Sequence, residues 1–333
     1  MIWGQPRRSV ARTALRSFAS RAPPWQNLRS RSLGRILPCL AMVLQTMPRD
    51  LGPGPTVSAG GFHTCALGQD EELLCFGGNW GLDSSGQCDV PADLGPVVGF
   101  SAGHEHSCAV AMDGSLHCFG LNFAEQCDVP GDLGTVQAVS AGRYHTCVVT
   151  TGAEAVCFGW NDDGQCDVPA DVESVLSVSA GGEHTCVVKQ DRQLMCFGLN
   201  DEGQCDIPND LGSVREVSAG YSHTCALKMD GQLICFGGNE DGQCDVPADL
   251  GSVVAVAAGG EHTCAIKMTG ELVCFGCGAD SEGQCDVPPD LGPVVSVSVG
   301  VAHTCAMTVG WLLVCFGLND DGQCDVPEDL TQA

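Results

Sequence analysis

The sequence predicts an all-β fold, a seven-bladed β-propeller with three or four antiparallel strands in each blade. A unit of about 39 residues recurs seven times along the 333-residue chain. Within the unit, apolar residues and turn residues follow the pattern of short strands, and no 3.6-residue apolar period of a helix is present. The 44 glycines and the low aromatic content of 5% indicate many tight turns around small packing units.

Each copy of the unit has the same three motifs in the same order. His-Thr-Cys, once His-Ser-Cys, begins at His63, His106, His145, His184, His223, His262 and His303. Cys-Phe-Gly follows, and then Gln-Cys-Asp-Val/Ile-Pro. The extra residues of copies one and six both fall between the last two motifs, which is typical of a surface loop.

The fifth copy shows how one unit folds. Its apolar segments predict strands over 214–219, 223–228 and 232–236, with Asp230-Gly231 as the turn between the last two. The proline of the third motif makes a long fourth strand doubtful. So small a sheet cannot bury both faces alone, and seven such units suit closure into a ring better than an open solenoid.

The chain divides into two regions of opposite charge. Residues 1–50 hold nine arginines and one acid, which gives +8, and residues 51–333 hold 6 basic and 40 acidic groups, which gives −34. A segment at 47–52 resembles the Val-Pro-x-Asp-Leu-Gly end of each copy and suggests where the ring closes, so we place the propeller at 46–333.

Residues 1–45 form an arginine-rich leader with the composition of an organelle transit peptide. Two alternatives are a secretory signal, whose apolar part is residues 36–44, and a disordered basic tail. An organelle or the secretory pathway is the favoured location, and the cytoplasm or nucleus is the alternative. No segment reaches the length of a membrane span.

The acidic charge of the propeller restricts its partners. It repels the phosphate backbone, so binding of DNA or RNA is not expected. A protein partner with a basic surface fits this charge, and we expect the chain itself to be a monomer.

The first two cysteines of each copy are ten residues apart, and the hairpin register places them opposite each other. They are candidate disulfides, with seven pairs of buried free thiols as the alternative. The candidates are Cys65, Cys75, Cys108, Cys118, Cys147, Cys157, Cys186, Cys196, Cys225, Cys235, Cys264, Cys274, Cys305 and Cys315. The third cysteine of each copy is interpreted as a free small apolar residue, and interblade disulfides or metal ligation are the alternatives.

No catalytic, cofactor-binding or metal site is predicted. His-x-Cys offers two zinc ligands per copy, which does not close a tetrahedral site. The acidic loops lack the spacing of an EF-hand and are interpreted as solvated turns, with weak calcium binding as the alternative. As candidate partner-binding loops they contribute Asp162, Asp163, Asp201, Glu202, Glu240, Asp241, Asp320 and Asp321. The histidines and acids recur in most copies, whereas an active site needs one asymmetric group of residues.

The unit V-x-x-V-S-A-G-x-x-H-T-C-A-L, followed by D-G-x-L-x-C-F-G-x-N-x-x-G-Q, resembles the regulator of chromosome condensation repeat, with Phe-Gly in place of that family's Trp-Gly. The short period and the Val-Pro ending are most similar to the branch that includes a bacterial β-lactamase inhibitor propeller, whose blades have three strands. The resemblance also implies that the repeated histidine is structural.

Such propellers are mainly binding platforms, so the resemblance implies a non-catalytic protein-interaction platform that uses the loops at one face. One alternative is a regulatory guanine-nucleotide exchange factor for a small GTPase, although the long insertion that the family's exchanger uses is replaced here by four residues near Trp80. Another alternative is a cation-binding or structural secreted protein.

Overall fold

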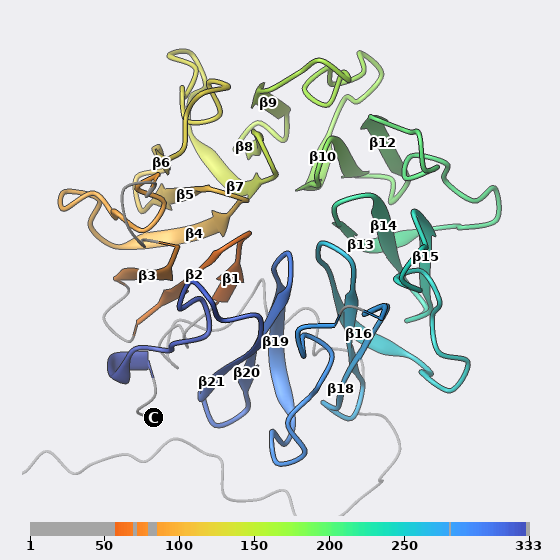
Figure 1. Cartoon of the computed structure of the whole chain (residues 1–333). Coiled ribbons are helices and arrows are strands. Elements are labelled where there is room, and N and C mark those ends of the chain that lie inside the picture. The colour runs from red at the N-terminus through yellow and green to blue at the C-terminus, as the bar shows by residue number, and fades with distance from the viewer. Residues whose placement is uncertain (1–56, 69–71, 79–84, 280, 331–333) are drawn as a thin grey trace, which may run out of the picture. The chain divides into compact units, whose positions relative to one another are not determined.

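A computed structural model describes residues 57–68, 72–78, 85–279 and 281–330. In these ranges the chain forms seven sheets of three antiparallel strands, which succeed one another around a central axis (Figure 1). The prediction of an all-β seven-bladed propeller is confirmed, with three strands per blade. No helix in the described ranges is long and apolar enough to cross a membrane.

The strands are named in chain order, so each blade contains three consecutive labels. The first strands are β1 (Val57–Ala59), β4 (Val97–Ala102), β7 (Val136–Ala141), β10 (Val175–Ala180), β13 (Val214–Ala219), β16 (Val253–Ala258) and β19 (Val294–Val299). The second strands are β2 (His63–Leu67), β5 (His106–Ala111), β8 (His145–Thr150), β11 (His184–Lys189), β14 (His223–Lys228), β17 (Thr263–Lys267) and β20 (His303–Thr308). The third strands are β3 (Leu73–Gly77), β6 (Leu116–Gly120), β9 (Ala155–Gly159), β12 (Leu194–Gly198), β15 (Leu233–Gly237), β18 (Leu272–Phe275) and β21 (Leu313–Gly317), and a 3-10 helix η2 spans Glu328–Leu330.

The fifth blade follows the predicted boundaries closely. β13 and β14 begin and end where the sequence predicts, and β15 begins one residue later than expected. The reason is that Gln232 belongs to the turn. Its N–H donates to Asp230 Oδ1 at 3.0 Å, and its carbonyl accepts from the Lys228 N–H at 2.9 Å.

The apolar core lies between neighbouring blades. The middle strand of each blade is buried on both faces because a blade packs against each side of it. Leu227 and Leu233 of blade five pack with Val253 and Val256 of blade six, and Leu250, from the Asp-Leu-Gly segment that joins the two blades, completes the cluster. Each copy thus supplies half of two interblade cores, which explains why the blades stack.

The last blade packs against the first in the same way. Leu330 of η2 contacts a cluster that includes Cys305 and Met307 of β20 and Ala66 of β2. The Ala59 N–H donates to Ser298 Oγ at 2.8 Å across the same junction. The segment 47–52, the leader and most of the insertion near Trp80 lie outside the described residues, so the boundary at residue 46 stays a prediction.

The propeller has two distinct ends. Each second strand begins where the third strand ends, as in the pairing of His145 with Gly159. The loops that join first to second strands, and the loops that follow the third strands, therefore lie at one end, called here the loop face. The hairpin turns between second and third strands form the opposite end, called the turn face.

Candidate functional site

The repeated histidines form a hydrogen-bonded ring around the axis. In each blade the histidine Nε2 lies 2.8–2.9 Å from a threonine or serine hydroxyl of the next blade. That hydroxyl donates to a glutamine carbonyl, as Thr146 does to Gln126 at 2.8 Å. The hydroxyl must therefore accept from Nε2–H, which fixes the neutral tautomer of the histidine.

This environment accounts for the titration of the histidines. Burial lowers the pKa of all seven to about 3 or about 4, with neighbouring histidines as a smaller cause in most blades. A neutral, fully buried imidazole that bonds the next blade has a structural role, as the resemblance implied. The described residues contain no group of three or more His, Cys, Asp or Glu side chains placed to hold a metal ion.

Two further sets of hydrogen bonds join the first strands around a narrow axial channel of about 180 Å³. The residue after each Ser-Ala-Gly donates its N–H to the glycine carbonyl of the next blade, as Arg143 does to Gly181 at 3.1 Å. In addition, the serine of the motif accepts an N–H from the next blade, as Ser140 does from Ala180 at 2.9 Å. Blade six has Ala257 at the serine position, so this second kind of bond cannot form between blades six and seven.

The structure contains the disulfide bonds that the sequence predicted. It joins the first two cysteines of every blade, with Cα atoms 4.0–4.1 Å apart. The sulfur of the His-x-Cys motif is bonded in this way in all seven blades. This sulfur is therefore not available as a metal ligand.

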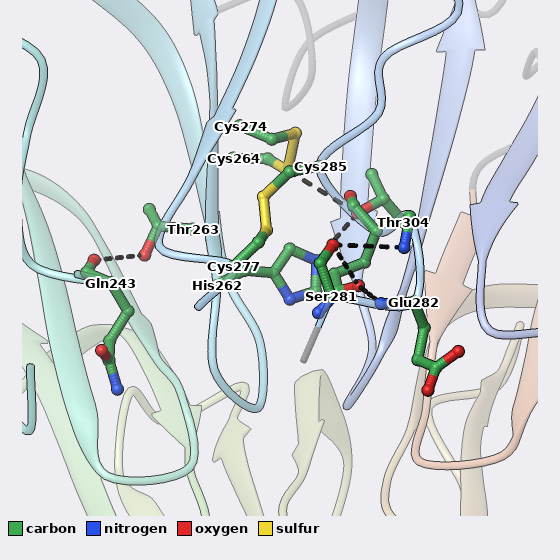
Figure 2. Close-up of a disulfide and its surroundings, with 12 residues drawn as sticks. Gln243, His262, Thr263, Cys264, Cys274, Cys277, Ser281, Glu282, Cys285 and Thr304 are labelled. Atoms are coloured by element: carbon green, nitrogen blue, oxygen red, sulfur yellow. Dashed lines mark hydrogen bonds between the residues drawn. A yellow bond between two sulfur atoms is a disulfide. The ribbon is translucent and has the colours of Figure 1, made fainter. Parts of the chain in front are cut away.

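The prediction for the third cysteines is wrong in blade six. Cys285 forms a disulfide with Cys277, which the insertion of that blade supplies, with Cα atoms 6.2 Å apart (Figure 2). A single copy with an extra cysteine nearby provides the partner that the other copies lack.

The other third cysteines also differ from simple apolar residues. Each donates its thiol to a backbone carbonyl at 3.1–3.5 Å, and burial together with an adjacent aspartate raises its pKa to about 11 or about 12. These thiols are Cys88, Cys127, Cys166, Cys205, Cys244 and Cys324.

The predicted acidic loops all lie on the loop face. Their asparagines hold the loop shape: Asn161 Nδ2 donates to Asp167 Oδ1 at 2.8 Å, and Asn161 Oδ1 accepts the Cys166 N–H at 2.8 Å. Asp162, Asp163, Asp201, Glu202, Glu240 and Asp320 are exposed, and Asp241 and Asp321 are half-buried.

An arginine lies among aromatic rings at the channel mouth, and the sequence analysis did not single it out. Arg143 Cζ lies 4.9 Å from the ring centroids of Tyr144 and Tyr221, the two tyrosines of the chain. Arg143 Nη1 donates to Glu183 Oε1 at 2.9 Å. Arg143 belongs to blade three and Tyr221 to blade five. The equivalent residue of blade four, between them, is Gly182, where a Cβ atom would lie 2.4 Å from the Tyr221 carbonyl oxygen.

His104 and Phe62 extend this group on the side of blades one and two. The ring of His104 lies edge-on to Phe62, with centroids 5.0 Å apart, and 6.0 Å from that of Tyr144. Burial, with the charge of Arg143 as the second cause, lowers the pKa of His104 to about 4, so it is neutral at pH 7. In the sequence, this group of residues is marked by variation between the copies, because the two residues after Ser-Ala-Gly differ from copy to copy.

Comparison with known families agrees with the resemblance drawn from the motifs. The model of the regulator of chromosome condensation (RCC1) repeat matches residues 56–87, 136–165, 175–204, 214–243 and 253–284. Five segments of the chain thus match the RCC1 repeat. No curated protein sequence matches it significantly.

Several solved structures contain similar propellers. The ectodomain of the receptor kinase CR4 from Physcomitrella patens superposes with a TM-score of 0.65 at 23% identity, covering 80% of this chain and 73% of that one. The ectodomain of ACR4 from Arabidopsis thaliana gives 0.61 at 23% identity, with coverages of 80% and 97%. Prp20p from Saccharomyces cerevisiae gives 0.62 at 17% identity, with coverages of 85% and 85%. At these identities the similarity shows the fold alone and carries no function across.

Proposed function

We propose that the protein is a non-catalytic interaction platform whose loop face binds a protein partner with a basic surface. One observation carries this proposal: the histidine, threonine or serine, and glutamine side chains that all copies share are buried at the blade junctions, whereas acidic side chains of several blades are exposed on the loop face. The shared histidines, threonines and serine are thus committed to holding the ring together. What remains accessible is a surface suited to recognition.

The acidity of the loop face supports the basic character of the partner. Its exposed acids come from at least four blades, as in Asp162 of blade three, Asp201 of blade four, Glu240 of blade five and Asp320 of blade seven. Exposed charges of one sign attract a partner of the other sign and raise the association rate, more so at low salt. The three-stranded blades also support our placing the chain with the short-bladed branch of RCC1-like propellers.

The experiment compares two neutralised variants of the full-length, oxidised chain. The loop-face variant changes five acids to amides at Asp162, Asp163, Asp201, Glu202 and Glu240. The control removes five acids of the turn face at Asp113, Glu154, Asp191, Asp230 and Glu271. Both lose the same charge, so only the position differs.

Proteins cross-linked to the wild-type chain are identified, purified and titrated against both variants. We expect affinity for a true partner to fall at least tenfold with the loop-face variant and to stay within twofold with the control. Equal losses with both variants would show a nonspecific charge effect and would overturn the proposal.

The second candidate is an exchange factor for a small GTPase, and the structural likeness to Prp20p favours it. That protein was examined for its binding to Gsp1p and histones. Nucleotide release from a panel of purified small GTPases separates the two functions, because a platform leaves release rates unchanged. A reproducible acceleration by the wild-type chain would favour exchange.

A further inference from the structure

Blades two and three carry exposed aromatic residues where the other copies have different residue types. Phe123 is 60% exposed and stands where the acidic loops have aspartate or glutamate, as at Asp162. Trp160 is 36% exposed and stands where three other copies have leucine. The Phe123 centroid lies 5.0 Å from that of Tyr144 and 6.4 Å from that of Trp160. We call Phe123, Tyr144 and Trp160 the aromatic patch.

The fold does not require this patch. At the positions of Phe123 and Trp160, other blades have residues such as aspartate, glutamate, leucine or glycine and still form the same interblade bonds. Exposed, clustered aromatic rings mark interaction sites, and Trp, Tyr and Arg are the residues that contribute most to binding at protein interfaces. Arg143, which stacks on Tyr144, borders the patch on its axial side.

The backbone beside the patch is strained. Glu125 has a φ of 63°, at a position where the equivalent residue of the other six blades is a glycine with φ between 75° and 87°. The other described non-glycine residues with positive φ, Ala153, Arg192 and Trp311, belong to turns of the turn face. Strain of this kind gathers at functional sites, where the local structure serves binding rather than stability.

The charges around the patch select the chemistry of its ligand. Asp162 and Asp163 follow Trp160 in the chain after Asn161, and Glu125 and Asp128 follow Phe123 by two and five residues; all four acids are exposed. Aromatic faces next to carboxylates are suited to a cationic side chain. The neighbouring Arg143 already shows this mode, because its guanidinium lies over two tyrosine rings and pairs with Glu183.

We infer that the aromatic patch is the centre of partner recognition and receives an arginine or lysine side chain from a basic segment of a protein partner. This inference rests on the proposed function and narrows it from the whole loop face to blades two and three. The acids of the other blades then attract the partner, and the patch determines how long it stays bound.

The test reverts the patch to the residues of the other copies. The variant Phe123→Asp with Trp160→Leu keeps residue types that the same loops already accept, so folding is preserved and is checked by thermal unfolding. The probe is a synthetic peptide with four Gly-Arg-Ser repeats, and the matched peptide has citrulline, a neutral isostere, in place of arginine.

Binding by charge alone and binding by the patch predict opposite changes in affinity for the arginine peptide in the reverted variant. If charge alone binds the peptide, the new aspartate strengthens binding. If the patch receives the arginine, we expect affinity for the arginine peptide to fall at least tenfold, with no binding of the citrulline peptide to the wild-type chain. Unchanged or stronger binding by the reverted variant, or no binding of the arginine peptide to wild type, would overturn the inference.

The five-acid loop-face variant separates this failure from that of the proposed function. If it loses the peptide while the reverted variant keeps it, the patch is wrong and an acidic platform stands. If the loop-face variant still binds the cross-linked partners, the proposed acidic platform is wrong.

Discussion

His303 Nε2 lies 2.9 Å from Thr64 Oγ1, so a side-chain hydrogen bond joins the last blade to the first. Thr64 also donates to the Gln323 carbonyl at 2.8 Å, and its geometry matches that at the other blade junctions. The ring is therefore closed by the same bonds that hold its neighbouring blades together.

Thr64→Val tests that closure. Valine keeps the shape but leaves the His303 N–H and the Gln323 carbonyl without partners in a buried site, which we expect to lower the free energy of unfolding by about 2–4 kcal/mol. Thr64→Ser is the matched control, since Ser107 performs the same role in blade two at 2.8 Å from His63 Nε2. Chemical denaturation of the oxidised protein measures both. Equal stability of the two variants would contradict a role for the hydroxyl.

Ala257→Ser adds the bond that one junction lacks. The new hydroxyl lies where the serines of the other blades accept an N–H from the next blade, and here the donor is Val299. We expect a gain of about 0.5–1 kcal/mol in the free energy of unfolding. The reciprocal change, Ser218→Ala, removes the bond from Ala258 N, which is 2.9 Å long, and should cost a similar amount. A destabilised Ala257→Ser would show that the junction cannot accommodate the hydroxyl.

Acid should unfold the ring through its buried histidines. Their folded pKa values of about 3 to 4 lie below the ordinary value of 6.5, so the unfolded chain binds more protons. The stability they contribute is complete above pH 6.5 and is lost as the pH falls toward 4. Glu216 opposes this trend, since burial raises its pKa to about 7, but it is one group against seven.

Thermal unfolding between pH 7.5 and 5 measures this effect, in a range where most surface carboxylates stay ionised. We expect the melting temperature to fall steadily with pH. The control is His117→Gln, which changes a histidine outside the ring. A flat profile in both proteins would contradict buried neutral histidines.

The thiol count distinguishes two disulfide patterns. The chain has 23 cysteines, and eight disulfides, including Cys277–Cys285, use sixteen of them. Alkylation in denaturant without reductant, followed by intact-mass measurement, should label seven thiols, one of which is Cys39. Nine labels would show that Cys277 and Cys285 are free, and 23 that the protein is fully reduced. In the folded protein the reaction should be slow, because the thiol pKa values are raised.

Glu125→Gly should relieve the strained loop of blade two. Glycine accepts the positive φ without steric cost, which we expect to stabilise the fold by about 0.5–1 kcal/mol after its larger loss of chain entropy. Arg192→Gly is the control on the turn face, where φ is 69°. A similar gain in stability from both changes, with weaker peptide binding only for Glu125→Gly, would assign the blade-two strain to recognition.

The fold could be predicted from the sequence because every copy contains the same local pattern of strand and turn residues. In blade five, the Asp230-Gly231 turn fixes the hairpin register, and the register places Cys225 opposite Cys235. Repetition was less informative about the site. A consensus drawn from seven copies removes the exceptions, and Phe123 and Trp160 are exceptions. The contact between Arg143 and Tyr221 also depends on the curvature of the ring and on Gly182 between them, neither of which a single copy contains.

Every disulfide in the described residues closes a loop inside its own copy, so no covalent link other than the chain itself joins one blade to the next. Under mechanical tension, or during translocation of the chain through a narrow pore, the blades should detach one by one. Each detached blade should extend by less than its full length, because the ten-residue loops stay closed until a reductant opens them.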